Sequence, residues 1–237
     1  MKQQNIVIII AMKKDLEKEK ELAAKEAVKY LKDNTIIGLG TGSTIYYVIK
    51  EIAELVKNGL KIKAVPTSIK TQELAISLGI PLIDINTVDK IDITIDGADE
   101  FTKDLTLIKG GGGALLREKI VASMTIQEII IADSSKLVEK LGKFKLPIEV
   151  VPFASTYVHS KIKELQGKGE IRHINNQTFL TDQGNYIIDA DFGFITNPSE
   201  LSIALNEIEG VVGHGLFINL TQKVIMGSTD QVIVFEK

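Results

Sequence analysis

Short apolar runs alternate with amphipathic segments along the first part of the chain. Thr35–Leu39 is a short apolar run that suits a buried strand, whereas Thr44–Asn58 has apolar residues at helical spacing and ends at a glycine. The same patterns predict helices over Asp15–Leu31, Ile69–Leu78, Leu115–Met124 and Ser135–Leu141, and strands over Lys61–Val65, Pro81–Ile85, Ile91–Ile95 and Glu128–Ala132. This alternation predicts an α/β fold, with an open, mostly parallel, Rossmann-like sheet and helices on both faces.

The pattern changes after Pro147. The elements predicted there are, in order, Ile148–Pro152 (strand), Thr156–Leu165 (helix), Glu170–Ile174, Thr178–Asp182 and Tyr186–Asp189 (strands), Ser199–Ile208 (helix) and Val211–Asn219 (strand). This order is typical of a smaller α+β, ferredoxin-like domain with an antiparallel sheet. We expect the last strands, Lys223–Met226 and Gln231–Phe235, to return to the first sheet. The predicted domains are therefore 1–142 with 214–237, and 143–213.

Composition excludes several classes of protein. A net charge of −3 gives no basic field that would attract nucleic acid. The chain has no cysteine, which fits a cytoplasmic protein, and its three histidines lack metal-ligand spacing, so we expect no metal. No apolar run reaches the roughly 18 residues that span a membrane. The apolar stretch Ile6–Met12 is predicted to be a strand or an N-terminal extension that other copies of the chain could cover.

The loop Gly38–Thr44, Gly-Leu-Gly-Thr-Gly-Ser-Thr, joins a predicted strand to a predicted helix. Its glycines let a ligand approach the backbone, and the N–H groups at the start of a helix favour an anion. It has no lysine at the position that a nucleotide-binding P-loop requires, so a sugar phosphate fits better than a nucleotide. Alternatively, the loop is a tight turn in which Ser43 or Thr44 caps the helix.

Two carboxylates flank a Gly-Ala pair in Asp96-Gly97-Ala98-Asp99-Glu100, directly after the predicted strand Ile91–Ile95. Ligands of open α/β sheets collect at such carboxyl ends of strands. Carboxylates repel a phosphate, so we expect these to face the hydroxyl end of a polyol that carries its phosphate at the far end. The alternative is a turn in which the aspartates bond to their own backbone.

Lys109 precedes the glycine run Gly110–Gly113, and Glu118 stands near the start of the next predicted helix. A lysine can stabilise a developing oxyanion, and a glycine run favours close contact between backbone and ligand. Glu118 is a catalytic candidate only because it follows this loop, since most glutamates on helices are solvated. Together these groups could move a proton on a small anionic substrate.

The chain resembles ribose-5-phosphate isomerase of the A type from about Glu21 to the C-terminus. The motifs that carry the resemblance are Gly38–Thr44, Thr67-Ser68, Asp96–Glu100, Lys109–Gly112, Arg117-Glu118-Lys119, Ile131-Ala132-Asp133 with Lys136, Leu141–Phe144, Leu146–Val150 and Gly210-Val211-Val212. The resemblance implies a cofactor-free isomerase that interconverts D-ribose 5-phosphate and D-ribulose 5-phosphate in the non-oxidative pentose phosphate pathway. The small domain and the apolar N-terminus offer surfaces to bury, so we expect a homodimer or homotetramer.

The resemblance also implies a role for each matching residue. Glu118 matches the general base, and Lys109 matches the cation beside the reacting oxygens. Asp96 and Asp99 match the carboxylates that handle hydroxyl groups, and which of them assists ring opening stays open. The substrate-binding residues that it implies, phosphate contacts first, are Ser43, Thr44, Thr41, Gly42, Gly97, Ala98, Gly110, Gly111, Gly112 and Lys136.

Two positions depart from the family pattern, and two other functions are alternatives to the isomerase. Gly113 stands where the family usually has alanine, and Leu116 where it usually has threonine, but neither change removes a catalytic group. A non-catalytic sugar-phosphate sensor on the same fold is the second hypothesis, although a sensor need not keep a base. A sister enzyme, such as a phosphosugar lactonase, a deaminase or a CoA transferase, is the third, because fold does not fix function.

Overall fold

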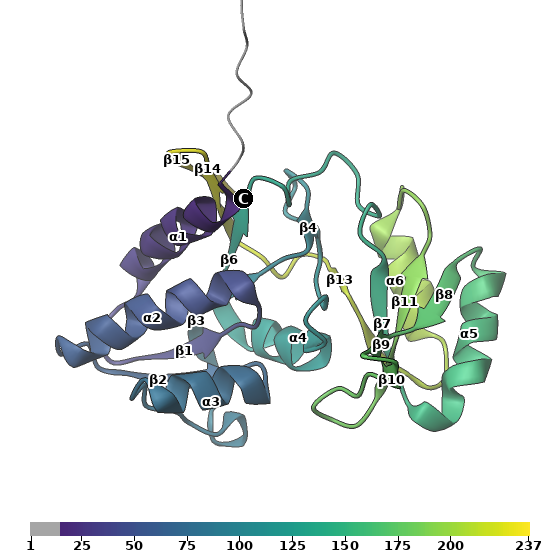
Figure 1. Ribbon diagram of the computed structural model, residues 1–237, viewed down its shortest axis with the longest axis horizontal. Helices are drawn as coiled ribbons and strands as arrows, with labels where there is room; N and C mark the ends of the chain where they lie inside the picture. Colours follow the sequence, from purple (N-terminus) through teal and green to yellow (C-terminus); the bar gives the residue numbers. More distant parts are fainter. Residues whose placement is uncertain (1–14) are drawn as a thin grey trace, which may run out of the picture.

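A computed structural model describes residues 15–237, so the prediction for Ile6–Met12 lies outside the described residues. The described chain forms a six-stranded sheet with helices on both faces and a separate four-stranded antiparallel sheet (Figure 1). The helices are α1 (Leu16–Ala27), α2 (Ser43–Lys57), α3 (Ile69–Ser77), α4 (Leu115–Ser123), α5 (Ser155–Glu164) and α6 (Pro198–Asn206), with 3-10 turns at Val28–Tyr30, Ile85–Thr87 and Pro152–Ala154. The predicted α/β fold with a smaller second unit is confirmed.

The large sheet has the strand order β15-β14-β6-β3-β1-β2 and is parallel except for β15. Its strands are β1 (Thr35–Leu39), β2 (Ile62–Pro66), β3 (Ile91–Gly97), β6 (Thr125–Asp133), β14 (Lys223–Ser228) and β15 (Gln231–Glu236). The C-terminal hairpin therefore returns to the first sheet, as predicted. A three-stranded sheet that the sequence did not indicate has the order β13-β5-β4 and consists of β4 (Glu100–Phe101), β5 (Leu107–Ile108) and β13 (Leu216–Phe217).

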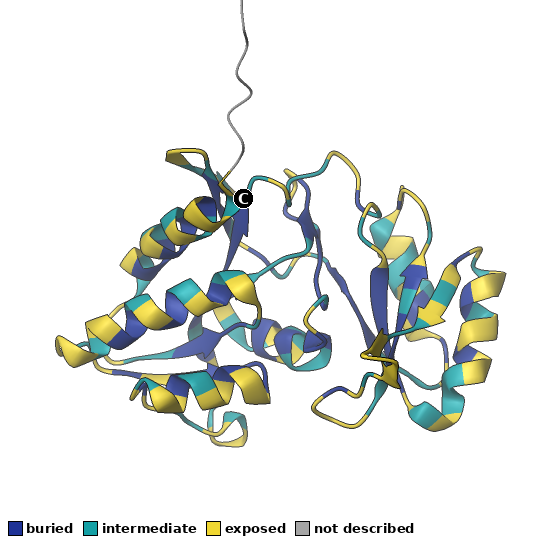
Figure 2. Cartoon of the chain, in the orientation of Figure 1, coloured by how far each residue is buried: buried dark blue, intermediate teal, exposed yellow. Residues whose placement is uncertain are grey.

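Alternation along β6 divides the core of the large sheet into two layers, because successive side chains of a strand point to opposite faces. Ile129 and Ile131 pack with α1 and α2, whereas Ile130 and Ala132 pack with the three-stranded sheet. Helices α1, α2 and α3 therefore cover one face, and α4 covers the other together with the three-stranded sheet (Figure 1). Figure 2 shows the deeply buried strands between half-exposed helices.

The second sheet has the order β12-β7-β11-β8. Its strands, with the small hairpin β9–β10 beside them, are β7 (Leu146–Val150), β8 (Lys168–Ile171), β9 (His173–Ile174), β10 (Gln177–Thr178), β11 (Tyr186–Asp191) and β12 (Val211–His214). Val158 and Ile162 of α5 and Leu205 of α6 are buried against it in a core of their own. The exact domain boundaries, 142/143 and 213/214, stay a prediction.

Two predicted elements are wrong, because side chains end the local pattern. Pro81–Ile85 is not a strand: Leu82 forms a single bridge to β2, and the Asp84 side chain then accepts the N–H of Asn86 and starts a 3-10 turn. Ser135–Leu141 is not a helix. The Asp133 side chain instead accepts the Ser135 N–H at 3.0 Å, and the chain continues as turns with one bridge to β4.

Three predicted strands are shorter than expected. Val211–Asn219 breaks at Gly215, whose N–H donates to Pro147 of the second sheet and whose carbonyl accepts from Lys109 beside the large sheet. Glu170–Ile174 divides at Arg172 into β8 and β9, and Thr178–Asp182 ends as a strand at Thr178. The N–H and the C=O of Gly215 thus bind strand β7 of one sheet and the residue that directly follows β5 of another. The chain passes from one sheet to the other at this residue and is not one continuous strand.

We expect Ile131→Ala to lower the free energy of unfolding by about 2–5 kcal/mol, because it leaves a cavity in the main core. Ile131 is fully buried, whereas Ile126 on the same strand is 57% exposed. Ile126→Ala is therefore the matched control, with an expected change of about 0.5 kcal/mol or less. Chemical denaturation followed by circular dichroism measures both variants, and equal destabilisation would contradict this description of the core.

Candidate active site

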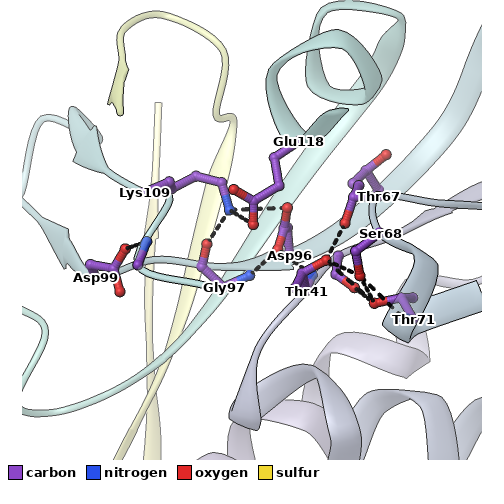
Figure 3. A network of polar contacts seen from close by, with 12 residues as sticks. Thr41, Thr67, Ser68, Thr71, Asp96, Gly97, Asp99, Lys109 and Glu118 are labelled. Atoms are coloured by element: carbon purple, nitrogen blue, oxygen red, sulfur yellow. Dashed lines mark hydrogen bonds and ion pairs between the residues drawn. The ribbon is translucent and has the colours of Figure 1, made fainter. Parts of the chain in front are cut away.

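The ammonium group of Lys109 lies at the centre of the site, directly after β5. Its Nζ lies 3.0 Å from Oδ2 of Asp96 and 3.4 Å from Oε1 of Glu118 (Figure 3). It also donates a hydrogen bond of 2.5 Å to the carbonyl oxygen of Gly97. Lys109, Asp96 and Glu118 are all buried, and they come from the end of β5, the end of β3 and the first turn of α4. The fold therefore brings three charged side chains from separate elements into one dry cluster.

Asp96 joins this cluster to the glycine loop between β1 and α2. Its Oδ1 accepts the N–H of Thr41 at 3.1 Å and the N–H of Gly97 at 2.7 Å. Gly40 permits this close approach, because a Cβ there would lie 2.1 Å from Asp96 Oδ1. The two motifs meet because β1 and β3 are parallel neighbours whose carboxyl ends share one edge of the sheet.

The other two carboxylates of the acidic motif point to different partners. Asp99 Oδ2 accepts the N–H of Gly111 at 2.7 Å, which ties it to the second glycine loop. Glu100 is buried and accepts the N–H groups of Gly142 and Phe144 at 2.8 and 2.6 Å. Asp99 is therefore available to the site, whereas Glu100 stabilises the chain that leads to the second sheet.

Burial changes the acid–base properties of the cluster. It raises the pKa of Glu118 to about 8, because the attraction of Lys109 only partly offsets the lost hydration and the nearby aspartates. Burial also raises the pKa of Asp99, against the hydrogen bond from the glycine loop. For Lys109, burial acts to lower the pKa, but the surrounding carboxylates outweigh it and the pKa rises. The site thus holds a permanent cation beside a carboxyl group that titrates near neutrality.

A cavity of about 90 Å³ lies against these groups. Its lining residues are Thr41, Gly42, Ser43, Thr44, Gly97, Ala98, Asp99, Lys109, Gly110, Gly111, Gly112, Glu118 and Lys136. The structure therefore gathers all the site residues named from the sequence around one cavity, except Asp96, which pairs with Lys109 but does not line the cavity. Lys136 reaches it from a turn after β6.

The start of α2 forms one wall of this cavity. The helix begins at Ser43 after Gly42, which has φ +124°, and its first intrahelical hydrogen bond runs from Tyr46 N to Gly42 O. The preceding N–H groups are left without a helical acceptor, and the hydroxyls of Ser43 and Thr44 stand beside them. This wall is suited to an anion, because N–H groups and the helix dipole both favour negative charge.

A cluster of hydroxyl groups around Thr41 was only partly anticipated. Thr41 Oγ1 lies 2.7 Å from Thr67 Oγ1, 2.9 Å from Ser68 Oγ and 3.3 Å from Thr71 Oγ1 (Figure 3). Thr71 Oγ1 donates to Gly40 O at 2.8 Å. Thr67-Ser68 was a matching motif of the sequence but was not predicted to be part of the site, and Thr71 was not predicted at all. Their position just after β2 was the available signal, since β2 is the parallel neighbour of β1.

Other chemistry finds little support within residues 15–237. No group of three or more histidine, aspartate or glutamate side chains in this range is arranged to hold a metal ion, and no helix in it is long and apolar enough to cross a membrane. His214 is buried and structural: its Nδ1 accepts the N–H of Leu216 at 3.2 Å, and its Nε2 lies 3.2 Å from Ser202 Oγ.

Comparisons with known proteins find relatives that match most of the chain. The sequence model of the family described as ribose 5-phosphate isomerase A (phosphoriboisomerase A) matches residues 63–231. The chain is 48% identical to ribose-5-phosphate isomerase A of Sphingopyxis alaskensis over 91% of this chain and 95% of that protein. It is 49% identical to the protein of the same name from Bacillus mycoides, over 90% of this chain and 97% of the relative.

Solved structures give the same result. A structure of D-ribose-5-phosphate isomerase in complex with phospho-erythronic acid is 41% identical, with a TM-score of 0.91 over 94% of this chain and 100% of the other. Ribose 5-phosphate isomerase A from Methanocaldococcus jannaschii is 40% identical, with a TM-score of 0.89 over 93% and 99% of the two chains. Sequence and fold are therefore similar over nearly the whole described chain.

We expect the carboxyl carbon of Glu118 to titrate in ¹³C NMR with a midpoint near pH 8. Lys109→Met should move that midpoint upward, because the ammonium favours the ionised carboxylate and its loss favours the protonated form. Lys57→Met is the control, since Lys57 forms an exposed ion pair with Glu54 on α2. A midpoint that does not move in Lys109→Met would show that the two groups are not electrostatically linked.

Proposed function

The chain belongs to the ribose-5-phosphate isomerase A family and interconverts D-ribose 5-phosphate and D-ribulose 5-phosphate; we propose that the cluster around Lys109 carries out this reaction by general-base proton transfer. One observation carries the proposal. A buried ammonium between two carboxyl groups lies on the same small cavity as the start of α2. A sugar phosphate has the matching polarity, with hydroxyls and a carbonyl at one end and a dianion at the other.

The phosphate binds at the start of α2 in this proposal. Ser43 and Thr44 offer hydroxyl groups and helix N–H groups there, and both residues line the cavity. Thr41 is held by its hydroxyl cluster, so the loop is fixed before the ligand arrives. Placing the dianion at this wall keeps it away from the carboxylates of Asp99 and Glu118, which would repel it.

Glu118 acts as the base. It removes the proton from C2 of the open-chain aldose; the electrons of that C–H bond form the C1=C2 double bond, and the π electrons of the C1 carbonyl move to its oxygen, which gives a cis-enediolate. The same carboxyl group then returns the proton to C1, while the hydroxyl proton of O2 moves to O1, which gives the ketose. A pKa of about 8 makes Glu118 a stronger base than an exposed glutamate and leaves part of it ionised at neutral pH.

Lys109 and Asp99 complete the chemistry. The Lys109 ammonium is fixed in a dry site before charge develops, which is the arrangement that stabilises an enediolate oxygen most strongly. Asp99 lines the cavity, whereas Asp96 does not, so Asp99 is the carboxylate that reaches the sugar hydroxyls and assists ring opening. Asp96 instead orients Lys109 and receives the N–H of Thr41.

We also propose that the protein acts in the cytoplasm as a homodimer or homotetramer. Large apolar side chains are exposed on the second unit, with Phe153 100%, Phe194 69% and Ile203 63% exposed. Such side chains favour contact with another copy. Light scattering after gel filtration tests the assembly, and a monomer at micromolar concentration would contradict it.

Proton exchange followed by NMR tests the proposed function directly. We expect D-ribose 5-phosphate in D₂O, with purified protein and no added metal or nucleotide, to yield D-ribulose 5-phosphate with deuterium at C1. Label at C1 reports the enediol route, since a hydride shift would not bring in solvent hydrogen. Folded protein that gives no conversion would favour a sugar-phosphate sensor or a sister enzyme instead.

Glu118→Gln should lower kcat by roughly 10²–10⁴-fold with little change in KM, because the amide cannot accept the proton. Glu54→Gln, an exposed change on α2, is the control and should behave like the wild type. Steady-state kinetics over a range of substrate concentrations measures both. Wild-type turnover in Glu118→Gln would remove Glu118 as the base.

Lys109→Ala should lower kcat by roughly 10²–10³-fold, because the enediolate oxygen loses its cation. Circular dichroism must first establish that the variant is folded, since the change leaves buried carboxylates without their partner. A variant in which only KM rises would identify Lys109 as a binding residue rather than a catalytic one.

A further inference from the structure

An arginine of the second unit holds the four-glycine loop from outside the cavity. Arg172 stands between β8 and β9, and its side chain is only 12% exposed. Its Nη1 donates to the carbonyl oxygens of Gly110 and Gly111 at 3.1 and 3.0 Å. The other edge of the guanidinium binds Asp189 of β11, with Nε 2.8 Å from Oδ2 and a second bond from Nη2 to Oδ1.

These contacts decide which way two peptide groups face. In a trans peptide the C=O of one residue and the N–H of the next point in opposite directions. Arg172 holds the carbonyl of Gly110 together with the N–H of Gly113, which lies 3.0 Å from it, so the N–H of Gly111 is turned toward the site, where it donates to Asp99 at 2.7 Å. By the same geometry, the bond to the carbonyl of Gly111 turns the N–H of Gly112 toward the cavity that Gly112 lines.

A run of glycines needs such an anchor. Glycine populates positive and negative φ about equally, so peptide groups in this loop meet little steric resistance to flipping. Two of its glycines, Gly110 and Gly113, have φ of +96° and +83°. The loop geometry is therefore set by its hydrogen bonds rather than by its own side chains.

Arg172 is itself held from two sides. Asp189 binds it with two parallel hydrogen bonds, the geometry that fixes a guanidinium most strongly. The ring of Phe179 lies 5.7 Å from the guanidinium carbon and also packs against the loop. A Cβ at Gly113 would lie 2.4 Å from that ring, so glycine rather than alanine suits this position. The guanidinium is thus placed before any ligand binds.

We propose that Arg172 is a positioning residue for the isomerisation: from the second unit, it orients the Gly111 N–H, which holds Asp99, and turns the N–H of Gly112 toward the substrate. This inference rests on the proposed function of the cavity. Asp189 balances the charge of Arg172, so its contribution is orientation rather than attraction of the phosphate. The N–H groups that it orients lie on the side of Asp99, where the sugar reacts. We therefore expect kcat, more than KM, to depend on it.

Steady-state kinetics of Arg172→Gln tests this inference. We expect kcat to fall by about 10–100-fold, less than for the loss of a direct oxyanion donor, with KM changed by about 3-fold or less. Arg172→Lys should recover part of the loss, because its ammonium can still donate to the loop carbonyls but cannot bind Asp189 through two parallel bonds. Lys145→Gln is the matched control. It removes a cation of the same unit that pairs with Glu170 at 3.0 Å and does not touch the loop.

A purely structural role for Arg172 would lower the stability of the protein but leave kcat of the folded variant unchanged. We expect the ¹⁵N–¹H resonances of Gly111 and Gly112 to shift or broaden in Arg172→Gln but not in Lys145→Gln. Asp189→Asn is the second variant, for use if Arg172→Gln does not fold. It is a milder change, and we expect a smaller loss of kcat. Wild-type kcat in folded Arg172→Gln or in Asp189→Asn, or unchanged loop amides, would overturn the inference. Wild-type protein without isomerase activity would defeat the proposed function instead, while the amide spectra would still report on the anchor.

Discussion

The burial of one ammonium group is the constraint on which the site depends. A charge taken out of water costs several kcal/mol unless anions and dipoles replace the lost hydration, and Lys109 has Asp96, Glu118 and the Gly97 carbonyl for this. These groups come from different elements, so the ends of β3 and β5 and the start of α4 must meet. The three-stranded sheet serves this purpose, since it carries Lys109, whose N–H donates to Gly215 O at 2.9 Å.

Glycine lets the backbone approach each of the two aspartates. A Cβ at Gly40 would lie 2.1 Å from Asp96 Oδ1, and one at Gly111 would lie 2.4 Å from Asp99 Oδ1. Each aspartate therefore lies against a different glycine loop, the first between β1 and α2 and the second between β5 and α4. The acidic motif lies between the two loops and binds both: Asp96 accepts the N–H of Thr41 in the first loop, and Asp99 accepts the N–H of Gly111 in the second. The glycines and the carboxylates therefore depend on each other, because each carboxylate needs a residue without a side chain beside it.

Those parts of the site that directly follow parallel strands could be predicted from the sequence, because the carboxyl ends of neighbouring parallel strands lie at the same edge of the sheet. The loops at Gly38–Thr44 and Asp96–Glu100 are examples. Lys109 and Glu118 were candidates from their places on either side of the glycine run, but the resemblance was needed to give them roles. No pattern indicates that the short strand β5 pairs with β13 over 100 residues later. Arg172, which lies 62 residues from Gly110 in sequence, carried no local signal at all. The break of the last predicted strand at Gly215 has the same tertiary cause, whereas the predictions for Pro81–Ile85 and Ser135–Leu141 were wrong because the local side chains of Asp84 and Asp133 bind the backbone two residues further on.

The interior holds one more carboxyl group near Lys109, and the balance of charge there bears on how one lysine can serve two stages of the proposed reaction. Glu128 of β6 is buried near this cluster, has no hydrogen-bond partner for either oxygen within residues 15–237, and has a pKa that burial raises well above its usual range. Burial thus disfavours the charged form of Glu128, so Asp96 and Glu118 are the carboxylates that contact Lys109. When Glu118 takes the proton from carbon, negative charge moves from its carboxylate to the enediolate oxygen. In the proposed reaction the Glu118 carboxylate and the enediolate oxygen both lie close to the Lys109 ammonium. The negative charge is therefore balanced by the same cation before and after the proton transfer.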